Sequence, residues 1–160
     1  MKIIAIDPGY ERVGIAILEK NISKEILLFS ECFKTPTTKS SEERLNLIGE
    51  EISKLIKKYE PTVMTLESLF FKNNAKTAMK VSEARGVMLY EAAKNKLKVT
   101  EFTPLQIKVA VTGYGKSEKE QVTMMVKKLI KIDKILQYDD EYDAIAVGLT
   151  FFAYFRNNMV

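Results

Sequence analysis

The sequence predicts an α/β domain in which a mixed five-stranded sheet is flanked by helices. Three observations lead to this prediction. Short apolar runs rich in β-branched residues occupy the first third of the chain, helical periodicity begins near residue 40, and strand-like and helix-like segments then alternate as far as residue 102. The chain has 160 residues, of which 46% are hydrophobic and 29% charged, so we expect one folded domain over residues 1–160.

The expected strands are short apolar runs that end at turn-forming residues. The first is followed by Asp7-Pro8-Gly9-Tyr10, a sharp turn signal, and hairpin-length links join the first three runs into an antiparallel meander. The first strand and the strand after the first helix are expected to be parallel neighbours at the centre of the sheet. The five runs are 2–6, 13–18, 26–33, 62–66 and 98–102.

The expected helices are identified by apolar residues at helical spacing and by capping residues. Ser40 and Ser117 are each followed three residues later by a glutamate, which is the spacing of a capping box. Thr103-Pro104 supplies an N-cap and a first-turn proline, and Pro61 ends the first helix. The five segments are 41–60, 74–96, 104–112, 118–130 and 139–156.

Two residue types on which many enzymes depend are nearly absent. The chain has no histidine and a single cysteine, Cys32, which excludes an intrachain disulfide, a zinc finger and any nucleophile activated by histidine. Catalysis by this chain would therefore depend on carboxylates, lysines, tyrosines or hydroxyls. No apolar run approaches the about 20 residues that a bilayer requires, and Asp7 interrupts the N-terminal run, so we expect a cytoplasmic protein that does not bind membranes.

Positive charge is concentrated in the middle of the chain. Residues 68–134 hold 14 Lys/Arg against six Asp/Glu, although the whole chain has a net charge of only +4. A basic region beside an acidic remainder favours a polyanion-binding surface next to a carboxylate site. The alternative, a solvated lysine-rich face with no ligand, is equally compatible with the charge alone.

Four acids occupy positions that favour a shared site. Asp7 and Glu67 each follow an apolar strand, and both lie at one edge of the sheet if those strands are parallel neighbours. Asp140 and Asp143 lie three residues apart at the start of the last helix, whose small apolar residues 144–148 allow close packing on the sheet. Oxygen ligands without histidine select Mg²⁺ or Mn²⁺, and two such ions can activate water and stabilise the leaving oxygen in phosphodiester hydrolysis.

Each of these acids also has an ordinary structural explanation. Aspartate before Pro-Gly commonly forms turns, and Glu67 could cap the loop that follows it. Acids in the first turn of a helix are favoured by the helix dipole. The residues alone therefore leave two alternatives open, a metal-dependent nuclease and a purely structural set of acids.

A series of short motifs extends over nearly the whole chain, from residue 3 to about residue 150. The motifs are Ile4-Ala5-Ile6-Asp7-Pro8-Gly9 followed by Gly14, Leu66-Glu67-Ser68-Leu69-Phe70, Asn74-Ala75 with Ala84-Arg85-Gly86, Gln106-Ile107-Lys108, Val111-Thr112-Gly113, Lys119-Glu120-Gln121-Val122 and Asp140-Glu141-Tyr142-Asp143-Ala144-Ile145-Ala146. Together they resemble the RuvC family of bacterial Holliday junction resolvases. The Asp-Pro-Gly turn alone is shared with other ribonuclease H-like proteins and with sugar kinases, whereas the whole set is specific.

This resemblance implies a ribonuclease H-like fold and a structure-selective DNA endonuclease of recombination and repair. Such an enzyme is a homodimer that makes paired nicks in strands of the same polarity across a four-way junction. By motif match, Asp7, Glu67, Asp140 and Asp143 are the catalytic residues and bind two Mg²⁺ ions per site, for which Mn²⁺ can substitute. The resemblance alone suggests a branch-migration motor complex as a further partner.

The resemblance also assigns DNA contacts. Phe70 matches an aromatic residue that inserts at the junction, where a ring can stack on an unpaired base for about 1–3 kcal/mol; burial in the core is the alternative. Lys108 and Lys119 match lysines near the scissile phosphates, and Lys119 lies in a first helical turn, where a cation is unfavourable unless an anion binds. The expected contacts to the duplex arms are Lys72, Lys76, Lys80, Arg85 and Lys116.

Two departures from the family pattern leave open how the start of the last helix packs and which carboxylates bind metal. Tyr142 stands where many relatives have alanine, and Asp139 and Glu141 add acids beside the matched pair.

Two other functions remain open. An RNA-processing nuclease of the same superfamily would share the fold, and a non-catalytic junction-binding protein would share the DNA contacts. Helix 74–96 has two apolar stripes, and the one around Val81–Ala92 is the expected contact between two copies of the chain.

Overall fold

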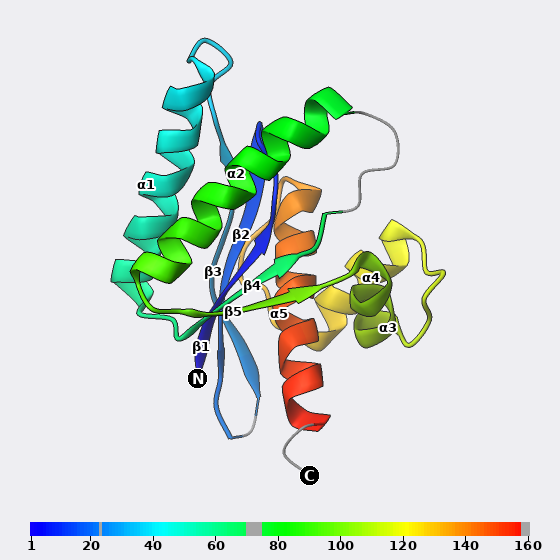
Figure 1. Ribbon diagram of the computed structural model, residues 1–160. Coiled ribbons are helices and arrows are strands. Elements are labelled where there is room, and N and C mark those ends of the chain that lie inside the picture. The colour runs from blue at the N-terminus through cyan, green and yellow to red at the C-terminus, as the bar shows by residue number, and fades with distance from the viewer. Residues whose placement is uncertain (23, 70–74, 158–160) are drawn as a thin grey trace.

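The chain forms one sheet with helices packed on both of its faces (Figure 1). The computed structural model describes residues 1–22, 24–69 and 75–157. The strands are β1 (Lys2–Asp7), β2 (Arg12–Lys20), β3 (Glu25–Lys34), β4 (Val63–Glu67) and β5 (Lys98–Phe102). The helices are α1 (Ser41–Tyr59), α2 (Ala75–Lys94), α3 (Pro104–Thr112), α4 (Lys119–Leu129) and α5 (Asp139–Asn157). The predicted mixed five-stranded sheet flanked by helices is confirmed.

The strands lie in the order β3-β2-β1-β4-β5. The pairs β1–β2 and β2–β3 are antiparallel, as their short links require, whereas β1–β4 and β4–β5 are parallel because helices cross over between them. Ile6 pairs with Leu66 across the two central parallel strands, so the next residues, Asp7 and Glu67, leave the sheet at the same edge. On its other side Asp7 pairs with Gly14 of β2.

Alternating apolar side chains build a separate core on each face of the sheet. Ile4 and Ile6 of β1 pack beneath α1 and α2, whereas Ile3 and Ala5 pack against the three C-terminal helices. Figure 1 shows the resulting layers, with α1 and α2 over one face and α5 over the other. Because the strand period is two, each core includes every second residue of the central strands.

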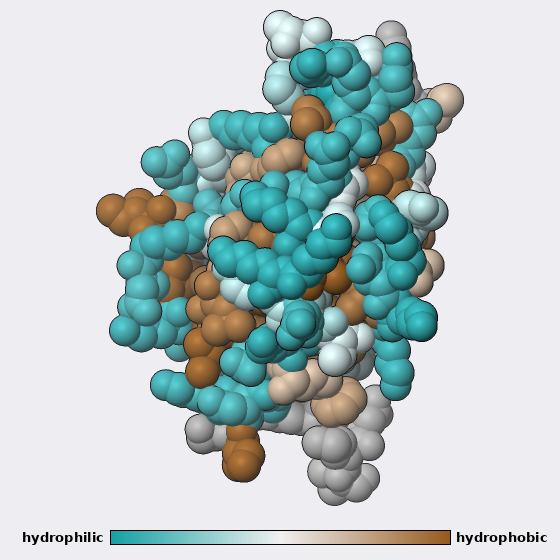
Figure 2. Space-filling view, turned by 90° about the vertical axis from the view of Figure 1, so that its left-hand side faces the viewer, coloured by the Kyte–Doolittle hydropathy of each residue, from teal (hydrophilic) through white to brown (hydrophobic). Residues whose placement is uncertain are grey.

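The outer surface on the α1 side is covered mostly by hydrophilic side chains, with apolar side chains visible between them and projecting at the left and lower edges (Figure 2). This surface is consistent with the amphipathic pattern of α1, whose buried residues include Ile48, Ile52 and Leu55. Within the described part of the chain, no helix is long and apolar enough to span a bilayer.

Helix α5 approaches the sheet closely because its inner residues are small. A Cβ on Gly148 would lie 2.5 Å from Cδ1 of Leu18 and 3.2 Å from Cβ of Ala5. Ala144 and Ala146 on the same helix are buried in the same core. The close packing predicted from residues 144–148 is therefore confirmed, and it brings the first turn of α5 to the sheet edge where β1 ends.

One of the two predicted serine caps is correct. The Ser40 backbone N–H donates to the Glu43 carboxylate at 2.9 Å, and the Glu43 N–H donates to the Ser40 hydroxyl at 3.4 Å. The cap predicted at Ser117 is wrong by one residue, because α4 has Glu118 as its N-cap. The Ser117 hydroxyl donates instead to the Tyr114 carbonyl at 2.8 Å, so it stabilises the preceding turn.

The α2 stripe that was expected to contact a second copy is internal instead. Ala84, Met88 and Ala92 have no exposed surface and pack in the core beneath α1 and α2. The outer side of α2 carries Met79 and Tyr90, which are 66% and 63% exposed. The sequence revealed two stripes, but their composition is too similar to show which of them packs on the sheet.

Candidate active site

The four predicted acids meet at the edge of the sheet where β1 and β4 end. Asp7 and Glu67 are the last residues of these neighbouring strands. The first turn of α5 reaches the same edge because Gly14 has no side chain. A Cβ there would lie 2.1 Å from the carbonyl oxygen of Asp140 and 3.1 Å from Cβ of Asp7. Gly14 therefore lets α5 bring Asp140 and Asp143 beside the strand ends.

Burial and mutual repulsion both oppose the charges of these acids. Burial raises the pKa of Asp7 well above its ordinary value, and the three neighbouring acids raise it further. Burial, followed by repulsion from Asp143, raises the pKa of Glu67 to about 7. Burial also raises the pKa of Asp143. The described residues give the Asp7 carboxylate no hydrogen bond and no ion pair, so they leave its charge without a direct partner.

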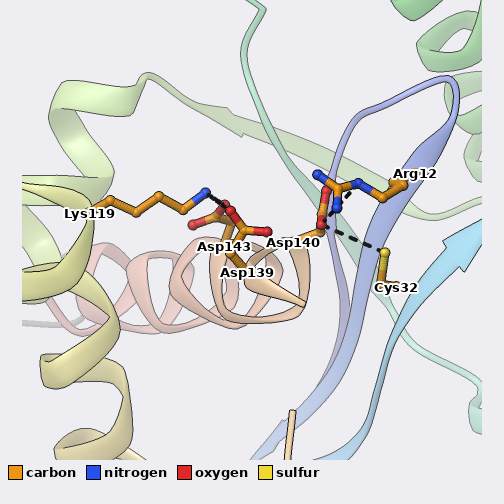
Figure 3. Close-up of polar contacts among 6 residues, drawn as sticks. All are labelled: Arg12, Cys32, Lys119, Asp139, Asp140 and Asp143. Carbon is orange, nitrogen blue, oxygen red and sulfur yellow. Dashed lines mark hydrogen bonds and ion pairs between the residues drawn. The ribbon is translucent and has the colours of Figure 1, made fainter. Parts of the chain in front are cut away.

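Lys119, the first residue of α4, neutralises one side of the acid cluster. Its Nζ lies 2.7 Å from Oδ2 of Asp143 and 2.6 Å from Oδ2 of Asp139 (Figure 3). Burial opposes the charge of Lys119, but its hydrogen bonds to the two aspartates outweigh burial and raise its pKa. The hydrogen bond from Lys119 lowers the pKa of Asp139. The lysine predicted to lie near a scissile phosphate is thus placed within the acid cluster.

Asp140 is held on the opposite side by two residues that the sequence analysis did not identify. Nε of Arg12 lies 3.5 Å from Oδ2 of Asp140, and the Cys32 thiol donates to the same oxygen at 3.7 Å (Figure 3). Burial, followed by the charge of Asp140, raises the pKa of Cys32 to about 11, so the thiol remains a protonated donor. The available signal for Arg12 was its position two residues before Gly14, on the strand that borders Asp7.

The acids open into two clefts rather than one. The first has a volume of about 330 Å³, and its charged lining residues are Glu67, Lys108, Glu118, Lys119 and Asp143. The second has a volume of about 350 Å³, and its charged lining residues are Glu11, Arg12, Lys80 and Asp140. Among the residues that the structure describes, no three acidic or cysteine side chains are already spaced as ligands of one metal ion.

The chemistry of the acid cluster nevertheless fits a hard divalent cation. Its donors are all carboxylate oxygens, which suit Mg²⁺ or Mn²⁺ better than zinc. Asp7, Glu67 and Asp143 have raised pKa values, and a cation among them would stabilise their charged forms. Two local changes would make the carboxylates available, the release of Asp143 by Lys119 and the release of Asp140 by Arg12.

The two additional acids of the last helix have other partners. Asp139 is exposed and pairs with Lys119. Glu141 is buried, and its Oε2 accepts hydrogen bonds from Ser30 at 2.8 Å and from Lys134 at 2.7 Å. Glu141 therefore points away from the cluster and fastens α5 to β3. Tyr142 packs partly against the core beside α4, which accounts for the larger side chain at that position.

The remaining predicted DNA contacts lie outside both clefts or outside the described residues. Arg85 forms an ion pair with Glu101 of β5, so this arginine already has a carboxylate partner. Lys116 is exposed in the turn between α3 and α4. The predicted contacts that lie outside the described residues are Phe70, Lys72 and the side chain of Lys76.

Residues 3–151 match the family model described as crossover junction endodeoxyribonuclease RuvC. The chain belongs to the RuvC family. RuvC of Thermosipho melanesiensis is 47% identical over 148 residues, which cover 92% of this chain and 94% of the relative. RuvC of Fusobacterium nucleatum is 41% identical over 150 residues, which cover 94% of this chain and 79% of the relative. The resemblance predicted from the motifs is confirmed.

Solved structures of RuvC proteins have the same architecture. A Thermus thermophilus RuvC structure matches with a TM-score of 0.88 at 28% identity, covering 99% of this chain and 97% of that chain. The structure of T. thermophilus RuvC in complex with Holliday junction substrate matches with a TM-score of 0.92 at 29% identity, covering 99% and 96%. This member of the RuvC family therefore has the ribonuclease H-like fold that the motifs implied.

Proposed function

We propose that this chain is a structure-selective DNA endonuclease that resolves four-way (Holliday) junctions by paired, symmetric nicks in recombination and repair. The observation that carries the proposal is the placement of Asp7, whose half-buried carboxylate lies among three other acids at the edge of a ribonuclease H-like sheet. Family membership supports the reaction type, and the T. thermophilus relative was solved in complex with Holliday junction substrate.

Two Mg²⁺ ions per active site, for which Mn²⁺ can substitute, would be held by Asp7, Glu67, Asp140 and Asp143. Two such ions lower the pKa of a bound water, hold the scissile phosphate and stabilise the leaving oxygen. The protein supplies the oxygen ligands and a partly enclosed edge of the sheet, where charges interact more strongly than in water. The raised pKa values support this assignment, because they show that the charged carboxylates are disfavoured unless a cation stabilises them.

The lysines of the first cleft would position the strand that is cut. Lys108 and Lys119 line this cleft beside Glu67 and Asp143. Lys119 lies in the first turn of α4, where the helix N-terminus also favours a bound anion. With Asp143 engaged in the metal site, the Lys119 ammonium can pair with a phosphate oxygen and hold the backbone across the acid cluster.

The enzyme is proposed to act as a homodimer, with a branch-migration motor complex as a further partner. A four-way junction has approximate two-fold symmetry, and a dimer with two-fold symmetry presents two identical sites to it, so that two nicks follow from geometry. Because the inner stripe of α2 packs in the core, the exposed stripe that includes Met79 and Tyr90 is the candidate contact.

Cleavage of labelled synthetic substrates tests the proposed function. A four-way DNA junction, a linear duplex of the same sequence and a structured RNA are each incubated with the protein at equal ionic strength, with Mg²⁺ or with EDTA. We expect symmetric nicks in the junction only, and only with Mg²⁺. Preferred cleavage of the RNA would indicate an RNA-processing nuclease, and tight junction binding with no nick would indicate a non-catalytic binding protein.

A further inference from the structure

Arg12 stands between the acid cluster and the second cleft. Its side chain is 49% exposed, whereas the side chain of Asp140, which it contacts, is 14% exposed. The separation of 3.5 Å between Nε and Oδ2 is longer than the usual distance in a charge-assisted hydrogen bond. Arg12 therefore holds Asp140 loosely, through one edge of a guanidinium group that can donate five hydrogen bonds.

The surroundings of Arg12 would become strongly cationic if Asp140 turned away. Lys80 lines the same cleft, with its Nζ 5.1 Å from the centre of the Tyr10 ring. Lys34 pairs with Arg12 across β2 and β3, and its Nζ lies 3.7 Å from the centre of the Tyr138 ring. The other acid that lines the cleft is Glu11, which is exposed. The cleft thus has cations in excess once Asp140 is engaged elsewhere.

We propose that Arg12 is a substrate-binding residue that exchanges partners. It neutralises Asp140 in the metal-free protein, and it contacts a backbone phosphate of the bound strand once divalent ions take that carboxylate. The inference rests on the proposed function, because it requires both a metal site and a nucleic-acid substrate.

The position of the acids explains why the strand would reach Arg12. Glu67 and Asp143 open into the first cleft and Asp140 opens into the second, with Asp7 close enough to all three to be affected by their charges. A strand whose scissile phosphate lies at Asp7 therefore has neighbouring phosphates toward both clefts. Lys119 is placed to meet one of them and Arg12 the other, and a guanidinium suits a phosphate as well as it suits a carboxylate.

Metal binding without DNA tests the first half of the exchange. In Arg12→Gln the cation that competes for Asp140 is removed, so we expect the dissociation constant for Mn²⁺, measured by calorimetry, to fall by about threefold or more. Lys57→Gln is the matched control, because it removes the same charge from an exposed residue of α1 that does not contact Asp140 and lines neither of the two clefts. The control is expected to bind Mn²⁺ like the unchanged protein.

Junction binding tests the second half of the exchange, the contact between Arg12 and a backbone phosphate. Affinity is measured at several KCl concentrations with Ca²⁺ in place of Mg²⁺, on intact junctions. We expect Arg12→Gln to bind the junction more weakly and to reduce the slope of log K against log salt by about 1, because one phosphate contact is lost. Arg12→Lys should recover most of the slope. Lys57→Gln, on the exposed side of α1, is the control and should leave the slope unchanged.

The outcomes separate this proposal from the proposed function. If Arg12→Gln changes neither Mn²⁺ binding nor the salt slope, or changes only one of them, the exchange of partners is wrong. If the unchanged protein binds no Mn²⁺ and nicks no junction, the proposed function is wrong, whatever Arg12 does. Tighter Mn²⁺ binding together with a smaller salt slope, in a protein that nicks junctions, supports the exchange.

Discussion

Asp7 and Glu67 carry their charges where burial and neighbouring acids both oppose ionisation. Carboxylates in such places destabilise the folded chain at neutral pH, because the folded state holds protons that the unfolded chain would release. Their presence at the ends of two central strands is difficult to explain by stability alone. Ionisable residues whose environment destabilises the folded state commonly serve binding or catalysis, and here the ligand that would stabilise their charged forms is a cation.

Replacement of Asp7 by asparagine separates cleavage from binding. Asp7→Asn keeps the size of the side chain but removes the charge of a proposed metal ligand, so we expect junction nicking in Mg²⁺ to fall by a factor of about 10³ or more. Junction affinity should be unchanged or higher, because a negative charge near the phosphates is lost. Gel-shift and cleavage assays on one labelled junction measure both quantities. Nicking at the unchanged rate would show that Asp7 is not part of a metal site.

The raised pKa of Glu67 predicts a pH-dependent stability in the metal-free protein. Its ordinary value is 4.5 and its value in the folded chain is about 7, so the folded state binds the extra proton between these limits. Stability is therefore greatest below about pH 4.5 with respect to this group, decreases as the pH rises through 7, and stays low above it. In EDTA at pH 8, Glu67→Gln should be about 1–2 kcal/mol more stable than the unchanged protein, after allowance for partial exposure.

Denaturant unfolding at pH 4.5 and pH 8 checks the Glu67 prediction. The difference between the two proteins should be much smaller at pH 4.5, where the glutamate is protonated in the folded state and half protonated in the unfolded state. Saturating Mg²⁺ at pH 8 should stabilise the unchanged protein more than the variant, because the variant lacks one ligand charge. An equal difference at both pH values would mean that the substitution acts through packing and not through charge.

At the scale of elements, the site depends on how closely α5 approaches β2. Gly14→Ala would put a Cβ 2.1 Å from the backbone oxygen of Asp140, and a backbone atom cannot move aside as a flexible side chain can. We expect α5 to shift at its first turn, with a loss of about 2 kcal/mol or more in stability and a larger loss of nicking than that instability explains. Thermal unfolding and cleavage well below the midpoint measure both effects.

Gly148→Ala is the matched control for this substitution. It also crowds the packing of α5, but its Cβ would mainly meet the end of the flexible Leu18 side chain, with Cβ of Ala5 at 3.2 Å, and Gly148 lies five residues beyond Asp143. Stability should fall while nicking, measured where the protein is fully folded, stays within a few-fold of the unchanged enzyme. Equal losses of nicking in the two variants would show that α5 docking in general, and not the local approach at Gly14, controls the site.

Most of the fold could be predicted from the sequence because its signals are local. Each of these signals lies within a short stretch of sequence: the strand and helix periods, the Ser40 cap and the small residues of α5. The choice between the two α2 stripes was not local, since it depends on which side meets the sheet. The cap of α4 was misplaced because two adjacent residues, Ser117 and Glu118, can both precede a helix, and the turn before α4 engages the serine.

The candidate site could be predicted only in part, because some of its contacts join residues that are distant in the sequence. Asp7 and Glu67 follow from strand ends, and the α5 acids follow from the helix start and the close packing behind it. The partners of Asp140 were not visible, because Arg12 and Cys32 lie more than 100 residues away and meet it only through the register of β2 and β3. The division of the acids between two clefts is a property of side-chain pairing, which a sequence pattern does not describe.

At the scale of the whole molecule, the proposed homodimer would bring two copies of the site to one junction. The exposed stripe of α2 has Met79, Gly86 and Tyr90 at helical spacing, and Tyr90 also lines a groove between α2 and α1. A charge in an apolar contact between copies would be desolvated without a partner. We therefore expect Tyr90→Glu to raise the dimer dissociation constant by about tenfold or more, as measured by equilibrium sedimentation. Tyr114→Glu is the control, because Tyr114 is 60% exposed and lies after α3, outside this stripe.

Whether the two nicks are made in one encounter tests whether paired cleavage needs the dimer. On a supercoiled plasmid with an extruded cruciform, two nicks in one encounter give a linear product, whereas a single nick relaxes the plasmid and removes the junction. Near the dissociation constant of the dimer, Tyr90→Glu should shift the product from linear to nicked circles, and a higher protein concentration should restore the linear product. A variant that is monomeric by sedimentation yet still gives mainly linear product would show that paired cleavage does not need the proposed two-fold dimer.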